Sequence, residues 1–427
     1  MKIPLADENR LTFMKNILII YSHWYPSNLA GVHRPRLIGN YLKDFGWQPY
    51  VLTVNSKFYE ETPDSNMELL FSKDFIEYRV DAFRVTKPRV IGDIGLRAFF
   101  QLYKKAIEII RKENVHFVWI PIPSFYVALL GRLLYEKTKI PYGIDYIDPW
   151  VRDISNRRNW RNILSNALAR FLEPIAIRKA SLITGVSEGY YRPALERNFK
   201  LGNTPPHLSF PYGFDPDDYN VEPIDVKLPW SGMQGCKPIV YAGAFLPNAI
   251  YFTDILFASI RKLIDENEFD PLIQFFFVGT GNYQHQSITE LAKKYGLTNI
   301  HEIRTRYPYT HVLSFLKNSF RVLVVGSTEP HYTASKLFQA LLSKKPMFAV
   351  FHENSTAKEI AREVNADQFF VSYNELMQEK DFHEHLYNKL KSFVRLDAEW
   401  SPELTKLEKY SSKECAREFV KLVNEVL

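Results

Sequence analysis

The sequence has few cysteines and no recognisable metal-binding pattern. Its 427 residues include two cysteines, Cys236 and Cys415, which lie far apart. Neither a disulfide framework nor a cysteine-based metal centre is therefore expected, and a reducing compartment such as the cytoplasm is the predicted location. The H-E-x-x-H spacing is absent, and the nearest approach, His383 and His385, has no clear partner. We predict that the protein uses no metal and no other cofactor.

Long hydrophobic runs and glycine-rich phosphate loops are also missing. The longest apolar stretch, residues 116–130, contains Pro121 and Pro123 and falls short of the roughly 20 residues that a membrane span needs. Polar residues interrupt residues 1–13, which we interpret as an N-terminal extension and not a signal peptide. The P-loop and the G-x-G-x-x-G fingerprint of dinucleotide-binding proteins are both absent.

The charge is distributed unevenly along the chain. Residues 151–200 hold ten Lys/Arg and four Asp/Glu, whereas residues 223–427 hold 24 of each sign. An anionic partner near the basic window is plausible, and an anionic membrane surface fits the aromatic residues between its cations better than nucleic acid does. A solvated basic helix face explains the same composition. The side chains interleaved with the cations of residues 152–179 include Trp150, Trp160, Phe171 and Leu172.

Apolar runs that are typical of strands buried on both faces recur along the chain. Helical patterns lie between many of them, which predicts an α/β protein with parallel sheets and helices on both faces. The predicted strands are 15–21, 50–54, 116–120, 142–147, 182–186, 238–243, 273–279, 321–325 and 346–351. The predicted helices are 37–45, 96–111, 127–134, 162–179, 255–264, 288–295, 311–316, 334–342 and 411–427.

The alternation pauses between residues 215 and 238, a polar stretch rich in proline and glycine. We predict two Rossmann-like, doubly wound domains that face a central cleft, where ligands bind at the carboxyl ends of the strands. The predicted parts are an acceptor domain at residues 14–215, a linker at 216–237, a donor domain at 238–410 and a closing helix at 411–427.

Two turns in the first half could carry chemistry. The turn at residues 23–36 follows the first strand, and its helix is expected to begin near Pro35. There Gly31 would let a ligand approach the backbone, while Arg34 and Arg36 would add positive charge. Asp148 follows another buried strand, where it could accept a hydroxyl proton or cap the next segment. For the first feature, a plain turn between strand and helix is the preferred explanation, whereas the two roles of Asp148 are equally plausible.

The second half contains the richest segment, residues 326–346. A buried strand leads into a polar turn, and a helix is expected to start near Thr333 and Ser335. Lys336 and Gln339 share one face of this helix. Its start and Lys336 would favour a diphosphate, and Gln339 could bind a ribose hydroxyl. An amphipathic helix with two surface polar residues is the simpler alternative.

One further motif is typical of a different class of enzyme, the hydrolases. Residues 185–189 (GVSEG) match the G-x-S-x-G pattern of hydrolases, with Ser187 as the nucleophile. No later histidine stands out as its partner, so we favour Ser187 as the cap of a helix.

The order and spacing of these pieces resemble GT-B-fold glycosyltransferases of the family-4 type. The resemblance covers nearly the whole chain from Met14, including Tyr25-Pro26 with Gly31, residues 180–187, 239–243, 277–281, 306–313 and 335–346. It implies transfer of a sugar from a nucleotide diphosphate to a sugar or lipid-linked acceptor, usually with retention and without a metal. By position, Gly31 would lie near the reaction centre, Gly243 and Gly279 would line the donor pocket, and Tyr307 would meet the nucleobase. Lys336 would contact the diphosphate with help from Arg306, and Gln339 would meet the ribose.

The chain departs from the family pattern at its acidic residues. Gln339 stands where the family has its second glutamate, His331 stands at the first, and Glu329 is the nearest acid. We predict Asp148, Glu329 and Lys336 as catalytic residues. Two alternatives remain open, a nucleotide-sugar epimerase of the same fold and a binding subunit without catalysis. Product analysis without an acceptor would separate the first from a transferase.

Overall fold

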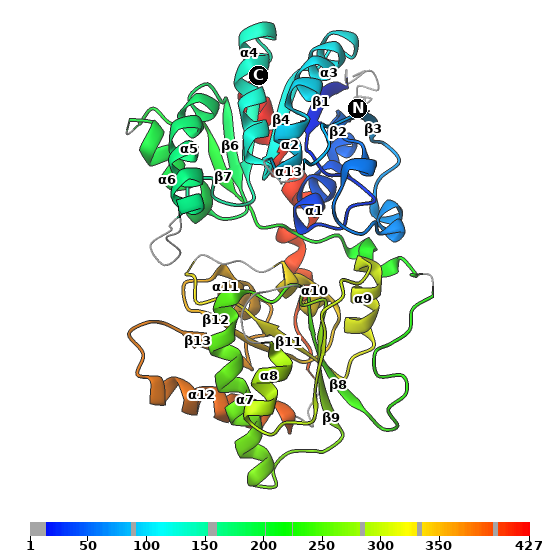
Figure 1. Cartoon of the computed structure of the whole chain (residues 1–427), viewed down its shortest axis with the longest axis vertical. Coiled ribbons are helices and arrows are strands. Elements are labelled where there is room, and N and C mark those ends of the chain that lie inside the picture. The colour runs from blue at the N-terminus through cyan, green and yellow to red at the C-terminus, as the bar shows by residue number, and fades with distance from the viewer. Residues whose placement is uncertain are drawn as a thin grey trace, which may run out of the picture. The chain divides into compact units, whose positions relative to one another are not determined.

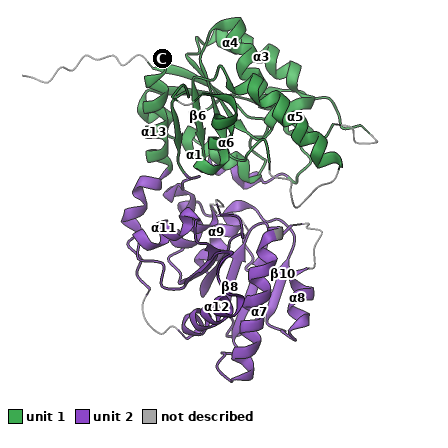
Figure 2. Cartoon of the chain, turned by 90° about the vertical axis from the view of Figure 1, so that its left-hand side faces the viewer, with its two compact units in different colours: residues 1–62, 71–210, 412–427 green, residues 63–70, 211–411 purple. Residues whose placement is uncertain are grey.

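The computed structural model describes residues 14–86, 91–152, 160–200, 202–223, 225–281, 287–330, 335–395 and 400–427. The chain divides into two compact units (Figure 2). Unit 1 contains residues 1–62, 71–210 and 412–427, and unit 2 contains residues 63–70 and 211–411. The chain therefore passes from one unit to the other four times.

Unit 1 is built on a parallel sheet of seven strands in the order β3-β2-β1-β4-β5-β6-β7 (Figure 1). Its interior strands are largely buried and mostly apolar runs, which is why the sequence pattern finds them. The strands are β1 Lys15–Ile20, β2 Trp47–Val54, β3 Ile76–Val80, β4 Phe117–Ile122, β5 Tyr142–Tyr146, β6 Leu182–Gly185 and β7 His207–Ser209. The helices are α1 Ala30–Gly39, α2 Ile94–Arg97, α3 Phe99–Lys112, α4 Ala128–Thr138, α5 Trp160–Ile177, α6 Glu188–Asn198 and α13 Ser412–Glu425.

Unit 2 repeats this plan with six parallel strands in the order β10-β9-β8-β11-β12-β13. The strands are β8 Lys237–Ala242, β9 Ile273–Val278, β10 Ile300–Ile303, β11 Arg321–Val325, β12 Met347–His352 and β13 Phe370–Tyr373. The helices are α7 Ile250–Asp265, α8 Ile288–Lys294, α9 Tyr309–Lys317, α10 Lys336–Leu342, α11 Thr356–Glu363 and α12 Glu379–Val394. Two α/β units with parallel sheets confirm the predicted fold class.

The closing helix α13 belongs to unit 1. Its apolar face, including Phe419 and Val423, is buried against residues of β1 and β4. The rings of Phe419 and Trp119 lie 4.6 Å apart. The last segment of the chain therefore completes the core of the first domain.

The predicted linker at residues 216–237 is instead part of unit 2. Trp230 is buried, and its ring lies 5.3 Å from that of Phe276 and 6.2 Å from that of Phe315. The polar composition of this stretch concealed one large anchoring side chain. The contact-defined boundary lies at residues 210 and 211, slightly before the predicted position at 215.

A short segment from the first half of the chain also packs in unit 2. Residues 63–70 contain the 3-10 helix Ser65–Leu70, in which Met67 and Leu70 are buried. Asp64, itself buried, accepts a 2.9 Å hydrogen bond from the backbone N–H of Tyr309. A carboxylate thus caps the start of α9, where it also interacts favourably with the helix dipole.

Candidate functional site

The candidate donor site of unit 2 lies where its strand order reverses. β8 is paired with β9 on one side and with β11 on the other. In doubly wound sheets, ligands bind beyond the carboxyl ends of the two strands at this point. The relevant described segments are residues 243–249 after β8 and residues 326–330 after β11, and α10 begins at Lys336.

Lys336, the first residue of α10, connects these two loops. Its Nζ atom donates hydrogen bonds to the Tyr241 hydroxyl at 2.7 Å and to the Ala244 carbonyl at 2.8 Å. The same atom lies 4.4 Å from the centre of the Tyr241 ring, within the range of a cation–π contact. The lysine is therefore held at the carboxyl end of β8 by neutral partners.

Among the described residues, the hydrogen-bond partners of the Lys336 ammonium are neutral, and this has an electrostatic consequence. Burial lowers the pKa of Lys336 to about 7. An ammonium group in such surroundings gains greatly from an anion placed beside it, because an opposite charge favours the protonated form. The site is thus suited to a phosphate group.

Gly243 and Gly279 lie side by side next to Lys336. Both have positive φ angles, +106° for Gly243 and +72° for Gly279, which L-residues with side chains rarely adopt. A Cβ atom at position 243 would lie 2.9 Å from Cε of Lys336. The N–H groups of both glycines donate within the sheet, to Val278 and Ile303. The glycines therefore contribute space and backbone shape to the site, while their amides serve the sheet.

Gln339 lies one turn further along α10 and faces a group of tyrosines. The Nε2 atom of the Gln339 side chain donates a 3.2 Å hydrogen bond to the Tyr309 hydroxyl. The backbone carbonyl of Gln339 accepts a 2.5 Å hydrogen bond from the Tyr219 hydroxyl. Tyr309 is the residue whose N–H is capped by Asp64. The position predicted to meet a ribose is therefore linked through Tyr309 to the segment at residues 63–70.

The other predicted donor-site residues are less closely connected. Glu329 is exposed and accepts a 3.0 Å hydrogen bond from Asn248 in the β8 loop. Ser335 occupies the N-cap position of α10 without a side-chain capping bond. The ring of Tyr307 packs edge-on against the ring of Phe315, so the backbone of Tyr307 is the part that could meet a base. The side chain of Arg306 is exposed. Thr333 and His331 lie outside the described residues.

In unit 1, Gly31 and Asp148 are both near the buried side chain of Tyr21. A Cβ atom on Gly31 would lie 2.1 Å from the Tyr21 hydroxyl, so a protein side chain already fills this space. Burial raises the pKa of Tyr21 far above its usual range, and the charge of Asp148 raises it further. The small size of Gly31 thus serves its packing against Tyr21, and its predicted place near the reaction centre stays a prediction.

The expectation that Arg34 supplies charge to a ligand is wrong. Arg34 and Asp145 are fully buried, and the guanidinium donates two 3.0 Å hydrogen bonds to the carboxylate. Thr184 donates a 2.6 Å bond to the same carboxylate, and Arg34 also donates to the Phe210 carbonyl at 3.0 Å. Helix α1 begins at Ala30 and not near Pro35, so Arg34 lies within the helix and its side chain points into the core.

The structure also shows the environments of Ser187, from the G-x-S-x-G pattern, and of Trp150, beside the basic window. Ser187 occupies the N-cap position of α6 with extended backbone geometry, although its side chain makes no capping bond. Trp150, one of the side chains proposed to meet an anionic membrane, is buried and stacks on Phe125.

Sequence patterns did not reveal Tyr241, Tyr309 or Asp64 as parts of the donor site. Tyr241 lies in the apolar strand β8, where the pattern predicts a buried core residue. Asp64 lies in a stretch with no periodicity, so no signal linked it to a helix 245 residues later. In the described part of the chain, no group of three or more possible metal-ligating side chains is found, and no helix has the length and apolarity to cross a bilayer.

Comparisons with known proteins extend the description of the fold. Neither protein-family models nor curated proteins match the sequence. Among solved structures, HepE from Anabaena in complex with UDP and glucose matches with a TM-score of 0.61 at 13% identity, over 96% of this chain and 100% of that one. Sucrose-phosphate synthase from Thermosynechococcus elongatus matches with a TM-score of 0.64 at 14% identity, over 96% and 99% of the chains.

A putative UDP-N-acetylglucosamine 2-epimerase from Listeria monocytogenes also matches, with a TM-score of 0.54 at 11% identity over 96% of both chains. At such identities the likeness concerns the fold alone. Together with the two doubly wound sheets, it shows that this chain has the two-domain, Rossmann-like GT-B fold.

Proposed function

We propose that this protein transfers a sugar from a nucleotide-diphosphate sugar to a hydroxyl group of an acceptor. The observation that carries the proposal is the placement of Lys336 beside Gly243 and Gly279 at the strand-order reversal of unit 2. A cation with a lowered pKa, next to backbone with no side chains, suits a diphosphate. HepE, which shares the fold, has been crystallised with UDP and glucose, which makes uridine nucleotides the first donors to test.

In this proposal Lys336 acts on the leaving diphosphate. Negative charge on the diphosphate grows as the bond to the sugar breaks, and a positioned ammonium stabilises that charge. Arg306 adds positive charge, and no metal is required. Ser335 and Thr333 precede the lysine along the chain, where they would meet the phosphates.

The nucleoside is assigned to the other end of α10. Gln339 would hydrogen-bond the ribose, with Tyr309 holding its side chain in place. The backbone near Tyr307 would meet the base. An amide binds a ribose hydroxyl less strongly than the carboxylate that the family usually has there. Glu329, which Asn248 holds near the β8 loop, is the acid available to this site.

Ligand binding followed by product analysis tests the proposal. Unfolding temperatures would be measured with UDP, GDP and ADP and with their sugars, because a ligand at 100 times its Kd stabilises a protein by about 2.7 kcal/mol. We expect one nucleotide class to stabilise the protein, and its sugar to be transferred to an added acceptor. Conversion of the sugar without an acceptor would support the epimerase, and binding without any turnover would support the non-catalytic subunit.

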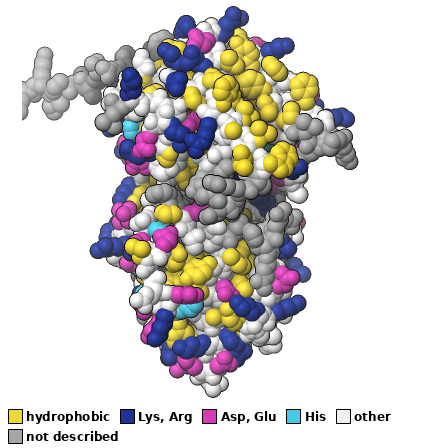
Figure 3. Space-filling model, turned by 60° about the vertical axis from the view of Figure 1, so that its left-hand side comes forward, with side chains coloured by type: hydrophobic (Ala, Val, Ile, Leu, Met, Phe, Trp, Pro, Cys, Tyr) yellow, Lys and Arg dark blue, Asp and Glu magenta, His cyan; other side chains and the backbone are white. Residues whose placement is uncertain are grey.

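We further propose that the acceptor is lipid-linked and that unit 1 rests on an anionic membrane, as in the assembly of cell-surface polysaccharides or glycolipids on the cytoplasmic face. The outer side of α5 carries a stripe of exposed apolar side chains at helical spacing, and Figure 3 shows hydrophobic side chains gathered on this part of unit 1. Trp160 and Phe171 are each 69% exposed. The other members of the stripe are Ile163, Leu164, Leu168 and Ile175.

The charges on α5 suit the same partner. Arg161, Arg170 and Arg178 are exposed, whereas the acid Glu173 is buried and paired with Arg197 at 2.8 Å. A helix with one apolar face and flanking arginines lies well at the surface of an anionic bilayer. An exposed apolar stripe of this length is unusual for a protein surface that meets only water.

Liposome flotation tests the membrane contact. We expect the protein to float with vesicles that contain phosphatidylglycerol and to stay at the bottom with neutral vesicles. Phe171→Glu should abolish flotation, whereas Leu376→Glu, at a 96% exposed position of unit 2, should not. Equal recovery with both vesicle types, or no effect of Phe171→Glu, would contradict this part of the proposal.

A further inference from the structure

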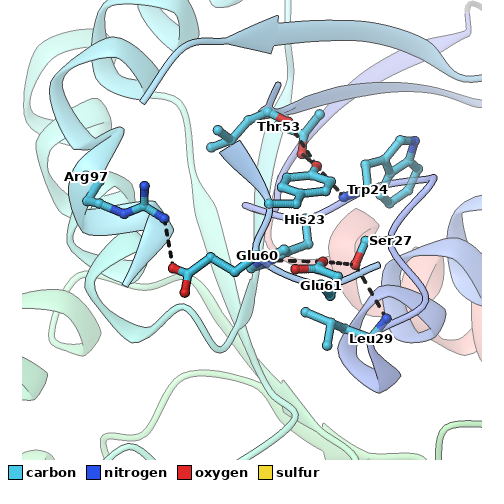
Figure 4. A network of polar contacts seen from close by, with 10 residues as sticks. His23, Trp24, Ser27, Leu29, Thr53, Glu60, Glu61 and Arg97 are labelled. Atoms are coloured by element: carbon cyan, nitrogen blue, oxygen red, sulfur yellow. Dashed lines mark hydrogen bonds and ion pairs between the residues drawn. The ribbon is translucent and has the colours of Figure 1, made fainter. Parts of the chain in front are cut away.

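Residues 63–70, which we call the strap, belong to unit 2, although the chain on both sides of them belongs to unit 1. The two residues that lead into the strap are held within unit 1 by their carboxylates. Glu60 accepts a 3.4 Å hydrogen bond from Arg97, and Glu61 accepts a hydrogen bond from the Ser27 hydroxyl (Figure 4). The chain that enters the strap is therefore fixed.

The strap is also fixed at its other end and along its length. Phe71, the residue that follows it, packs its ring edge-on against that of Trp24 within unit 1, with 4.8 Å between the ring centres. In the strap itself, the side chains of Met67 and Leu70 are buried. The strap is thus a short docked segment between two anchored ends.

Asp64 forms the polar contact between the strap and α9. Its Oδ2 atom accepts a 2.9 Å hydrogen bond from the Tyr309 N–H, and its Oδ1 atom accepts a 3.0 Å bond from the Asn66 N–H within the strap. Pro308 occupies the N-cap position of α9 and makes no side-chain capping bond. The Asp64 carboxylate therefore supplies the cap, and its negative charge lies at the positive end of the helix dipole.

Tyr309 connects this cap to α10. It is the first residue of α9, and its hydroxyl accepts a 3.2 Å hydrogen bond from Nε2 of Gln339. The cap and the hydroxyl belong to one residue, so a shift of the first turn of α9 would move the hydroxyl away from Gln339. The orientation of the Gln339 amide therefore depends on the cap that Asp64 provides.

We propose that the docked strap controls the nucleotide affinity of unit 2, with Asp64 as a positioning residue that acts through Tyr309 on Gln339. This inference rests on the proposed function, in which Gln339 meets the ribose. Without the docked strap, the amide loses its partner, and a nucleotide must order it on binding at a cost in entropy. Because such coupling is reciprocal, a bound nucleotide favours the docked strap by the same factor.

The first test removes the cap in the full chain. Asp64→Ala should raise the Kd for UDP, measured by calorimetry, by at least about fivefold, the low end of the usual range for coupled sites. The control is Asp270→Ala, which removes a carboxylate that also accepts a 2.9 Å bond from a backbone N–H, but at the amino end of β9. Its Kd should stay within about twofold of the wild type. A folded Asp64→Ala variant with an unchanged Kd would overturn the inference.

A double-mutant cycle tests the route through Tyr309. Tyr309→Phe keeps the ring and the backbone N–H that Asp64 accepts, and it should raise the Kd for UDP about threefold, the scale of one neutral hydrogen bond. Adding Asp64→Ala to this variant should raise the Kd by less than about twofold more, because the connection to Gln339 is already broken. A fully additive increase would show that Asp64 acts by another route and would overturn the inference.

Hydrogen exchange reports on the strap itself. In the wild type, saturating UDP should slow amide exchange in residues 65–70 by at least about fivefold, and Tyr309→Phe should lose most of this protection. Unchanged exchange would contradict the coupling. Circular dichroism establishes that each variant is folded, and if Asp64→Ala does not fold, an unchanged Kd for Tyr309→Phe overturns the inference. Failure of the wild type to bind UDP, GDP and ADP would instead refute the proposed function.

Discussion

The loop after β1 in unit 1 and the loop after β8 in unit 2 hold the same place in the same strand order, yet their chemistry differs. In unit 2, two glycines with positive φ and one lysine with neutral partners leave backbone and a potential charge for a ligand. In unit 1, the corresponding region is filled by side chains, which include the buried Arg34–Asp145 pair and the contact between His23 and Glu61.

The difference teaches that one strand order can present very different surfaces at the same position. Unit 2 offers a cation and open backbone, which would suit a diphosphate. Unit 1 fills the equivalent position with polar and charged side chains. In unit 1 the arginine that follows the first strand stabilises the core, because its charge is matched by Asp145.

The strongest way to break the comparison is to remove the carboxylate that pairs with Arg34 in unit 1. Asp145→Ala would leave Arg34 buried without its charge partner, and we expect the free energy of unfolding to fall by about 3–5 kcal/mol. Chemical denaturation measures this. Asp74→Ala, which breaks the exposed pair with Lys43, should cost at most about 1 kcal/mol. Similar losses for both variants would show that Arg34 does not depend on Asp145.

The second prediction concerns the cation of unit 2. Lys336→Ala should lower kcat/KM for the nucleotide-sugar by at least about tenfold, equivalent to roughly 1.4 kcal/mol, because the leaving diphosphate loses its ammonium partner. Steady-state kinetics with a saturating acceptor measures the effect, and exposed Lys293→Ala is the control. An unchanged rate would remove Lys336 from the site.

The third prediction sharpens the contribution of the glycines. Gly243→Ala places a Cβ atom 2.9 Å from Lys336 Cε at a φ of +106°, so the lysine must move. We expect the Kd for UDP, measured by calorimetry, to rise about fivefold to tenfold, corresponding to roughly 1 kcal/mol. Gly232→Ala, where a Cβ atom meets nothing within 4 Å, should bind normally. Normal binding by both variants would indicate that the lysine adapts without loss.

The smallest expected effect comes from pH. Since the pKa of Lys336 is about 7 in the free protein, the lysine loses its proton as pH rises above 7, and a bound diphosphate must restore it. UDP should therefore bind about fivefold more weakly at pH 8 than at pH 7, with uptake of a proton. Calorimetry in two buffers of different ionisation enthalpy measures the proton. Lys336→Ala should show neither effect, and pH-independent binding by the wild type would contradict the assignment.

The sequence was sufficient to predict the interior of both sheets. Every predicted strand is present, because strands such as β1 and β11 are buried apolar runs. Four strands were missed, namely β3, β7, β10 and β13. All four are short strands at the edges of the two sheets. Three of them, β3, β7 and β10, consist mostly of half-buried residues, so the sequence shows no continuous apolar run there.

The candidate sites were predicted less completely. Lys336, Gly243 and Gly279 were selected from the sequence, and the structure brings them together. Contacts such as Asp64 with Tyr309 and His23 with Glu61 join residues from loops without periodic patterns. Arg34 was misassigned because local sequence does not show that a buried carboxylate lies 111 residues away.

The placement of α13 has a consequence for how the protein forms during synthesis. The core beneath β1 and β4 is closed by Phe419 and its neighbours, which are synthesised after unit 2. We expect the nascent first domain to keep the apolar face of its sheet uncovered until α13 has left the ribosome. All of unit 2 is synthesised by residue 411, before α13. Unit 2 can therefore complete its fold on the ribosome before unit 1 does, although most of unit 1 precedes it in the chain.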